Sequence, residues 1–326
     1  MPAPTNAAPA TTLILTWREN EVWWLAQPAD IALQEKALRS TATTALPRGL
    51  RPRMSHPALA IPLLAYLAAF YGYPVAAMLF RSIAEPTWTI ENFAKIFETP
   101  VFLYVLWLTF RVALVVTVIS LLLGFPVAYL LARMDKARSN LLMMLVLLPF
   151  WTSILVRTYA WMVLLGRQGI INQFLQWVGA IDAPIRLLNT TFAVYVAMVH
   201  ILLPFMILPL YSVIRGIDGN LLRAAEGLGA RPIAVFRQVV LPLSLPGISA
   251  GCLLVFILAL GFFITPALVG GPKDLMIAVL IQQQVELFNW PFASALAALL
   301  LTAALLVFLG FAKRLGIEEA IGRARS

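Results

Sequence analysis

The sequence predicts an all-α polytopic membrane protein with six transmembrane helices, and composition is the first reason. Of the 326 residues, 61% are hydrophobic and only 12% are charged, whereas soluble domains have about 45–50% apolar and about 25% charged residues. The second reason is that the apolar residues form stretches of about 20, the length that a helix needs to cross a bilayer. The third is that the basic residues lie between these stretches, with most of them on one side of the predicted membrane.

Six stretches are long and apolar enough to span a bilayer. They cover residues 58–80, 103–132, 141–165, 192–213, 245–269 and 292–312. Several contain prolines, which membrane helices tolerate because neighbouring groups satisfy the backbone groups that a proline leaves free. The interior prolines expected to kink these helices are Pro74, Pro126, Pro149, Pro204, Pro209 and Pro266.

The basic residues give the orientation of the helices. In a soluble protein the net charge of +9 would suggest nucleic acid, but here topology and anionic lipid explain it, so membrane lipid and no nucleic acid is expected. One side carries Arg39, Arg48, Arg51, Arg53, Arg133, Lys136, Arg138, Arg215, Arg223, Arg231, Arg237, Lys313, Arg314, Arg323 and Arg325. The other side carries Arg81, Lys95, Arg167, Arg186 and Lys273. The excess places both termini and residues 220–246 in the cytoplasm.

The two ends of the chain differ in composition from the apolar spans. Residues 1–56 begin with an Ala-, Pro- and Thr-rich segment, show no cleavable signal peptide, and are expected to form a largely disordered cytoplasmic extension. A short interfacial helix is the alternative for one part of it, which contains Ile14, Trp17, Val22, Trp23, Trp24 and Leu25. Residues 316–326 are the expected cytoplasmic tail. The single cysteine, Cys252, excludes an intrachain disulfide and a cysteine metal cluster.

The connections on the side opposite the termini are expected to carry structure of their own. Residues 85–100 predict a surface helix, and residues 270–272 (Gly-Gly-Pro) predict a turn. Residues 279–290 are polar and too short to span, so they predict a periplasmic or re-entrant segment. Residues 166–189 predict a short amphipathic helix whose apolar face combines Ile170, Ile171, Phe174, Leu175 and Val178.

Residues 220–246 form the longest polar interruption between two apolar spans and predict a hairpin of two short helices. In the first helix an apolar stripe is formed by Leu221, Ala225 and Leu228. Asp218 and Asn220 offer N-cap oxygens at its start.

The turn and the second helix of this hairpin have their own signals. Gly229 suits a left-handed helix end, and Pro232 suits the first turn of the second helix. In that helix a second stripe is formed by Ile233, Phe236 and Val240, and two prolines are expected to break the chain after it, namely Pro242 and Pro246.

The spacing within this hairpin resembles the EAA signature of the permease subunits of binding-protein-dependent ABC importers. That signature consists of EAA, three intervening residues, a Gly, nine intervening residues and then I-x-L-P. The matching residues here are Ala224, Ala225, Gly229, Val239, Leu241 and Pro242. Arg223 stands where the signature has Glu, and Glu226 is out of register. The resemblance implies a coupling helix that docks into a cleft of a cytoplasmic ATPase subunit through Arg223, Ala224, Ala225, Glu226, Gly229, Leu241 and Pro242. A solvated connector is the alternative for the same residues.

Further segments resemble the spermidine/putrescine branch of this family. They are PLSLPGISAG, FFITPALVGGP, MIAVLIQQQ, NWPFASALA, LPFWTSILVRTYAWMVLLG, GIIN and ILLPFMILPLYSVI, and the resemblance covers roughly residues 58–315. It implies a type I importer fold in a bacterial inner membrane, with a first helix and external segment at 57–102 and a transmembrane domain at 103–315. The implied partners are a second homologous permease, two ATPase subunits and an extracytoplasmic substrate-binding protein. Other solutes of the class are iron chelates, thiamine and opines.

Few residues inside the spans carry chemistry. Arg111 and Arg157 are the only charges there, and they either line a water-filled path or extend outward to the membrane surface. Cation–π contacts of about 0.5–2 kcal/mol each are one way to guide an amine without carboxylates. With Arg157, the candidate path residues are Trp151, Tyr159, Tyr195, Phe262, Phe263 and Glu286. The aromatic members, together with Trp161, have lipid-facing or packing roles as the alternative. His200 is expected to hydrogen-bond across helices.

Enzyme activity and independent transport are both disfavoured. The sequence has no nucleophile–base pair and no phosphate-binding GxxxxGK[ST] loop, so ATP hydrolysis is expected in a separate subunit, and no cofactor or metal is expected. A secondary transporter is the alternative transport class, but the spans lack the carboxylates that commonly relay protons. A membrane-bound enzyme lacks any catalytic constellation.

Overall fold

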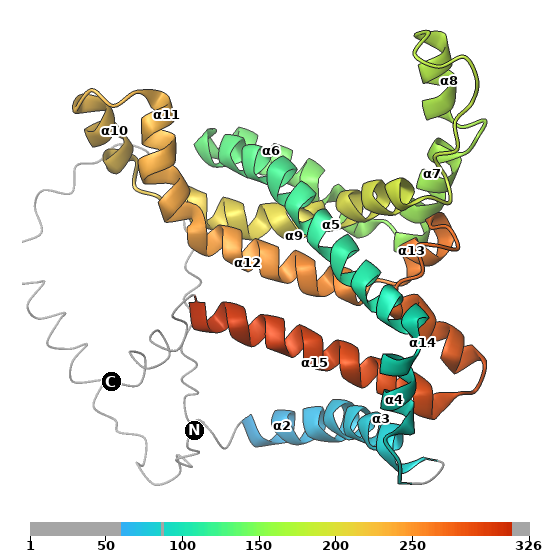
Figure 1. The fold of residues 1–326 in the computed structure, drawn as a ribbon. Coiled ribbons are helices and arrows are strands. Elements are labelled where there is room, and N and C mark those ends of the chain that lie inside the picture. Colours follow the sequence, from blue (N-terminus) through green and yellow to red (C-terminus); the bar gives the residue numbers. More distant parts are fainter. Residues whose placement is uncertain (1–59, 86–87, 315–326) are drawn as a thin grey trace, which may run out of the picture. The chain divides into compact units, whose positions relative to one another are not determined.

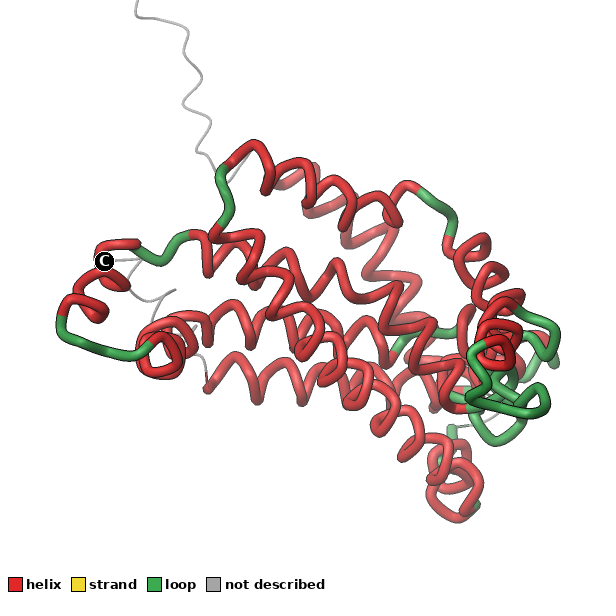
Figure 2. The backbone as a smooth tube through the Cα atoms, turned by 90° about the horizontal axis from the view of Figure 1, so that it is seen from above, coloured by secondary structure: helices red, strands yellow, loops and turns green. Residues whose placement is uncertain are grey.

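The computed structural model describes residues 60–85 and 88–314, and these residues contain helices and loops but no strand (Figure 2). The expectations for residues 1–56 and for the tail at 316–326 lie outside this range. The chain divides into two units, Met1–Ala65 and Tyr66–Ser326. The first unit contributes only residues 60–65 to the described range, so the fold is that of the second unit.

The helices follow one another along the chain without long gaps (Figure 1). In order they are α2 (Ile61–Leu67), η2 (Ala68–Gly72), α3 (Tyr73–Ala84), α4 (Glu91–Glu98), α5 (Pro100–Arg133), α6 (Lys136–Leu147), η3 (Leu148–Trp151), α7 (Ile154–Leu165), α8 (Ile170–Trp177), α9 (Thr191–Arg215), α10 (Gly219–Gly227), α11 (Pro232–Val235), η4 (Phe236–Val240), α12 (Leu241–Leu260), α13 (Ile264–Val269), α14 (Ile277–Glu286) and α15 (Trp290–Arg314). Figure 1 shows α10 and α11 at one end of the bundle and α4, α8, α13 and α14 at the opposite end.

The spans confirm the all-α membrane prediction. Five described helical segments are long and apolar enough to cross a bilayer, namely Ile61–Ala84, Pro100–Arg133, Thr191–Arg215, Pro232–Leu260 and Trp290–Phe311. A sixth span results if the bent pair Lys136–Trp151 and Ile154–Trp177 is counted as one. The short helices expected within residues 85–100 and 166–189 are α4 and α8, and the segment at 279–290 falls largely on α14.

The third predicted span, 141–165, corresponds to this bent pair, and the kink expected near Pro149 is a break at which the chain bends by 94°. Pro149 has no N–H group to donate, and the Thr152 hydroxyl donates to its carbonyl at 2.8 Å. Ser153 then caps a new helix by accepting from the Leu155 N–H at 3.3 Å. The break at Thr152 and Ser153 therefore has a local sequence cause.

The fifth predicted span, 245–269, was wrong at both ends. One helical segment runs from Pro232 through the two prolines expected to break it and ends at Leu260, and α13 follows as a separate helix. A π turn explains the continuity, because the Leu241 N–H donates to the Phe236 carbonyl five residues earlier. This wider turn precedes Pro242 and makes room for its ring beside the preceding turn. The π turn η2 stands in the same position before Pro74.

The core of the second unit is the contact of α9 with α5 and α12. Met206 on α9 is fully buried and lies between two glycines. A Cβ atom at Gly124 of α5 would be 3.1 Å from the Met206 Cγ, and one at Gly251 of α12 would be 2.7 Å from its Sδ. Small residues allow membrane helices to approach closely, so these two glycines set the spacing of the three helices.

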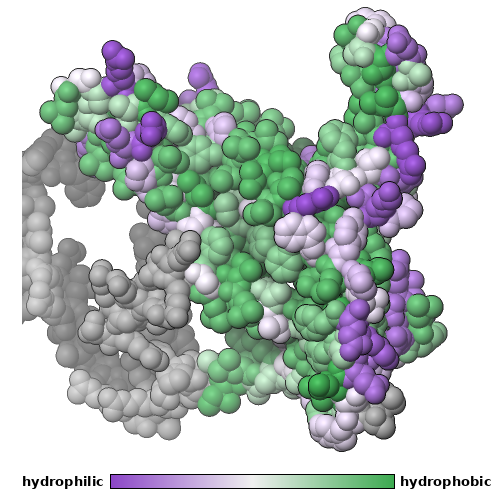
Figure 3. Space-filling view, viewed as in Figure 1, coloured by the Kyte–Doolittle hydropathy of each residue, from purple (hydrophilic) through white to green (hydrophobic). Residues whose placement is uncertain are grey.

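A second buried cluster joins α4, α5, α14 and α15 near the end of the bundle opposite α10. Phe102 and Phe292 have ring centroids 5.1 Å apart, and Ile96 lies beneath them in the same cluster. The Ile277 N–H donates to the Thr109 hydroxyl at 2.8 Å, which ties the start of α14 to α5. Outside these clusters the surface over the spans is apolar, as Figure 3 shows, and is suited to lipid or to partner helices.

Replacing Gly251 by Val is expected to lower the melting temperature of the purified protein. The added side chain meets Met206 and the backbone carbonyl behind it, at 3.3 Å from the new Cβ, and overpacking of this kind costs about 1–3 kcal/mol. Gly261→Ala is the matched control, because a Cβ there meets nothing within 4 Å. Equal melting temperatures for Gly251→Val and the unmodified protein would contradict the packing described here, and Met206→Ala should partly restore the loss.

Candidate functional site

The turn of the predicted hairpin is a Schellman motif at the end of α10. The Gly229 N–H donates to the Glu226 carbonyl at 2.9 Å, and the Ala230 N–H donates to the Ala225 carbonyl at 3.1 Å. Gly229 has a φ of +82°, which glycine adopts without strain. At the start of α10, the Asp218 carboxylate accepts from the Asn220 N–H at 2.9 Å. The predictions for Asp218, Gly229 and the first-turn position of Pro232 are confirmed.

The apolar stripe of α10 is not covered by other residues that the structure describes. Leu228 at the tip is 89% exposed and Leu221 is also exposed, while Ala225 is half-buried. Leu222 is instead the residue of α10 that faces the bundle, at a cavity of about 200 Å³. Together with Ile233, which is 67% exposed, the hairpin presents apolar side chains to its surroundings.

The second predicted stripe was wrong as one face of a helix. Phe236 is half-buried and Val240 is buried, but Ile233 faces outward. The buried pair is Val235 and Val240, which are five residues apart. That spacing matches the period of a π turn, so the π turn between them places both on the buried side.

Phe236 anchors the second arm of the hairpin to α5. Its ring stands edge-on to Phe125 and to Tyr129, with centroid distances of 5.7 and 5.9 Å. The Arg133 guanidinium in turn lies over the ring of Tyr129, 4.8 Å from its centroid. Aromatic pairs in this geometry contribute about 0.5–1.5 kcal/mol each beyond the area they bury.

Arg215 fixes the end of α9 to the end of α5 beneath the hairpin. Its Nη1 donates to the Ala132 carbonyl and to the Met134 carbonyl, both at 2.7 Å. These carbonyls lie at the C-terminus of α5, where helical groups have no partner within the helix. The sequence assigned Arg215 to membrane orientation alone and missed this capping role, because its acceptors are about 80 residues away along the chain.

The predicted coupling residues fall into two places. Arg223, Ala224, Ala225, Glu226 and Gly229 lie on α10 and its turn, whereas Leu241 and Pro242 begin α12 within the continuous helix. Arg223 and Glu226 are exposed. In the described part of the chain, neither takes part in an ion pair.

The predicted path residues are spread over several elements rather than gathered into one cavity. Trp151 ends η3 and is almost fully exposed, Arg157 and Tyr159 lie on α7, and Tyr195 is half-buried on α9. Phe262 and Phe263 occupy the break between α12 and α13. Glu286 ends α14 and accepts from the Gln282 side chain at 3.2 Å. Arg111 is exposed on α5, and the buried Nε of Arg157 has no hydrogen-bond partner in the described residues.

Polar contacts join α7 and α13, the helices that follow the two breaks, to each other and to α9. The hydroxyls of Thr158 on α7 and Thr265 on α13 are 3.0 Å apart, and both are buried. The Trp161 Nε1 donates to the Nδ1 of His200 at 3.2 Å, which confirms the cross-helix hydrogen bond expected for this histidine. The sequence did not pair these threonines, because neither lies in a recognisable motif.

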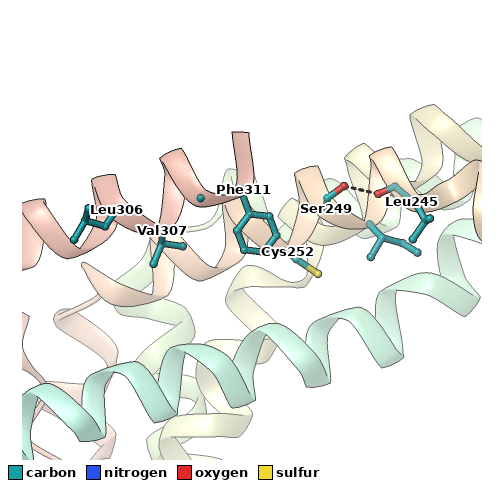
Figure 4. Close-up of a pocket in the computed structure, with 8 residues that line it drawn as sticks. Leu245, Ser249, Cys252, Leu306, Val307 and Phe311 are labelled. Atoms are coloured by element: carbon teal, nitrogen blue, oxygen red, sulfur yellow. Dashed lines mark hydrogen bonds between the residues drawn. The ribbon is translucent and has the colours of Figure 1, made fainter. Parts of the chain in front are cut away.

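An apolar groove of about 630 Å³ lies between α12 and α15, away from the predicted site residues (Figure 4). Figure 4 shows Cys252 and Ser249 on one wall and Phe311 and Val307 on the other. The Ser249 hydroxyl bonds back to the Leu245 carbonyl and is not free for a ligand. The described residues of its lining include no charged side chain, so this part of the groove suits an apolar occupant rather than a polar solute.

Phe236→Ala is expected to loosen the hairpin while the bundle stays folded. Loss of two aromatic contacts of about 0.5–1.5 kcal/mol each predicts roughly tenfold faster amide exchange in residues 232–240. Hydrogen–deuterium exchange of the purified protein measures this. Ile233→Ala, an exposed position on the same arm, is the control and should leave exchange unchanged. Equal exchange in both variants would show that Phe236 does not anchor the arm.

Comparisons with known proteins agree with this arrangement. Residues 124–315 match the family described as binding-protein-dependent transport system inner membrane component. The chain is 42% identical over 241 residues to the spermidine/putrescine transport system permease protein PotB of Haemophilus influenzae, covering 73% of this chain and 79% of that protein. It is 41% identical over 215 residues to PotB of Escherichia coli, covering 66% and 78%.

A solved structure shares the fold. A chain in the crystal structure of a bacterial alginate ABC transporter, in complex with an alginate pentasaccharide-bound periplasmic protein, matches with a TM-score of 0.62 at 18% identity, covering 79% of this chain and 93% of that chain. The fold is therefore the type I permease fold expected from the hairpin signature. The chain belongs to the family of binding-protein-dependent transport system inner membrane components, the permease subunits of ABC importers.

Proposed function

We propose that this permease forms half of the translocation pathway of an importer for spermidine, putrescine or a related amine. The observation that carries the proposal is the identity with the two PotB proteins, which extends over most of the chain. The described spans also carry no Asp or Glu, so an amine meets no fixed counter-ion at membrane depth. Weak binding of the amine within the membrane favours its release after passage.

The exposed hairpin is the proposed contact with a cytoplasmic ATPase subunit. Leu228, Leu221 and Ile233 present an uncovered apolar surface on a knob with a defined turn, which suits insertion into a cleft. The positive-inside asymmetry of the sequence supports a cytoplasmic location for this end of the bundle. In this proposal Arg223, Ala224, Ala225, Glu226 and Gly229 make the contact, while Leu241 and Pro242 connect it to α12.

The proposed transmission runs from the hairpin into three helices. When the paired ATPase subunits close on ATP, the hairpin is pulled with them. Phe236 passes the displacement to α5, Arg215 keeps α5 and α9 together, and the continuous segment from Pro232 to Leu260 carries it along the membrane. Residues 103–315 act as the transmembrane domain in this proposal, with residues 57–102 as a preceding helix and external segment and residues 1–56 and 316–326 in the cytoplasm.

The proposed pathway combines this chain with a second, homologous permease. Trp151, Tyr159 and Phe263 are exposed in the single chain, as expected for aromatic faces that line a path completed by a partner. The breaks at Thr152–Ser153 and Gly261–Phe263 bring irregular backbone into the apolar part of the chain, which membrane proteins tolerate where it is buried in protein or lines a cavity. Tyr195, Phe262, Arg157 and Glu286 are the remaining proposed contacts.

Deleting this subunit from the complete transporter is expected to abolish uptake of labelled spermidine or putrescine by cells. The unmodified transporter is the reference, and re-expression of the chain should restore uptake. Unchanged uptake with the ATPase still co-purifying would remove the amine assignment and leave the other solutes of the class, iron chelates, thiamine and opines.

The double variant Gly229→Asp with Ala225→Asp is expected to abolish ATPase co-purification and uptake. An L-residue at the positive φ of Gly229 costs about 1–2 kcal/mol, and a charge at Ala225 opposes burial in an apolar cleft. The matched control is Gly179→Asp, since Gly179 also has positive φ, at +74°, and open surroundings, but lies at the opposite end. Co-purification of the ATPase with the double variant would show that the hairpin does not make the contact.

A further inference from the structure

Helix α8 (Ile170–Trp177) carries an apolar surface that no described residue covers. Trp177 is 83% exposed, Ile170 is 61% exposed and Phe174 is 57% exposed. These three recur at i, i+4 and i+7, so they lie on one face of the helix. The opposite side carries Gln176, which is exposed, and Asn172, which is buried. The helix is therefore amphipathic, and much of its apolar face is open to whatever surrounds this chain.

The direction of α8 is fixed at its start and along its buried side. Gly169 is buried, its N–H donates to the Gly166 carbonyl at 2.9 Å, and a Cβ atom there would meet the Leu164 carbonyl at the end of α7. Only glycine permits so close a turn. On α8, the Nδ2 of Asn172 donates to the Gly166 and Ile185 carbonyls at 3.1 and 3.0 Å, and its Oδ1 accepts from the Ile185 N–H at 3.1 Å. These bonds hold α8 to the end of α7 and to the loop that returns to α9.

The position of α8 is that of a helix at a membrane surface. Figure 1 shows α9 and α12 running along the bundle, whereas α8 projects sideways from the end opposite the hairpin. Residues 166–169 alone separate α8 from α7, which belongs to the bent pair that forms the sixth span. The helix therefore begins close to the depth at which the chain leaves the apolar part of the membrane, and it runs across the direction of the spans.

The polarity of this projecting arm matches that of a bilayer surface. Figure 3 shows hydrophobic residues on the side of the arm that faces the level of the spans and hydrophilic residues on its outer side. Tryptophan favours the headgroup layer, and an amphipathic helix with Trp and Phe on its apolar face lies in the plane of the membrane, with that face buried by about 5–10 Å.

The charge of the arm also suits lipid. Arg167, just before α8, is exposed, and residues 154–181 contain no Asp or Glu that would repel the phosphate groups of lipids. Direction, depth, polarity and charge all agree with a lipid surface, whereas a protein partner would require none of the four. Lipid is therefore the favoured occupant of the exposed face.

We infer that α8 lies on the lipid bilayer as an interfacial helix, with Ile170, Phe174 and Trp177 inserted at the boundary between headgroups and acyl chains. The inference goes beyond the proposed function and does not depend on the solute. Only the assignment of α8 to the outer leaflet rests on the proposed cytoplasmic location of the hairpin. Because α8 follows α7 closely, its contact with lipid also holds the outer end of the helix that carries Arg157 and Tyr159 while the hairpin moves.

The test places spin labels on α8 in the complete transporter in lipid nanodiscs, with the other subunits made cysteine-free. Cys252 is the only cysteine of this chain, so Cys252→Ser provides the background. Phe174→Cys puts a label on the exposed apolar face, and Gln176→Cys, also exposed, is the matched control on the opposite side. Collisions with oxygen, which concentrates in lipid, and with a water-soluble nickel chelate locate each label. The ratio of oxygen to nickel collisions should be several-fold higher for Phe174→Cys, and Trp177→Cys should repeat that result.

Three results would overturn the inference. Frequent nickel collisions at Phe174→Cys and Trp177→Cys would place the face in water. Labels shielded from both reagents would place it against another protein, such as the second permease. Equal ratios on the two sides of α8 would show that the helix has no orientation relative to lipid.

Two controls keep these results interpretable. The melting temperature of each labelled variant should equal that of the Cys252→Ser parent, because the substituted side chains are exposed. The measurement is repeated on the full chain alone in nanodiscs, where the ratios do not depend on the other subunits. Failure of the proposed function would therefore leave these ratios unchanged, whereas failure of the inference would alter them.

Discussion

The contact of Met206 with two glycines sets the spacing on which the other helices depend. Met206 lies on α9, and the glycines on either side belong to α5 and α12, so one side chain fixes three membrane helices at once. Lipid tails are as apolar as the side chains of such helices, so the burial of apolar surface gives the helices little reason to associate. Close packing at small residues is what holds them together instead. The hairpin and the helices that follow the two breaks are attached to this three-helix core.

Both ends of the bundle use polar or aromatic contacts to attach irregular segments to that core. At one end, Arg215 caps α5, and Phe236 packs on the same helix. At the other, Asp274 and Asn172 hold turns through backbone hydrogen bonds. The polar side chains at both ends, the exposed Arg215 and the buried Asn172 and Asp274, each bond to backbone atoms that would otherwise lack a partner. These contacts attach the segments at both ends to the helices beside them.

The sequence predicted those features that depend on local chemistry. Hydropathy located the spans, and Gly229 with Pro232 located the turn of the hairpin, because left-handed backbone and the first helical turn each favour one residue type. Features that depend on distant contacts were missed, including the Arg215 cap and the Thr191–Asp274 bond, whose partners are about 80 residues apart. The effect of a proline was predicted only in part. The kink expected at Pro149 is a full break between two helices, whereas Pro242 lies within a helix that was expected to stop, because a π turn before Pro242 makes room for its ring.

In the proposed mechanism, the continuous segment from Pro232 to Leu260 acts as a lever, and the hairpin lies at the end of its longer arm. The segment touches Met206 at Gly251, which leaves a long arm of 19 residues toward the hairpin and a short arm of 9 residues toward the break at Phe262. At 1.5 Å per residue these arms measure about 28 and about 14 Å. If the segment pivots at this contact, a displacement of the knob arrives at the far end reversed in direction and about half as large. In the proposed mechanism, the position of this glycine along the segment would set the ratio between the displacements at its two ends.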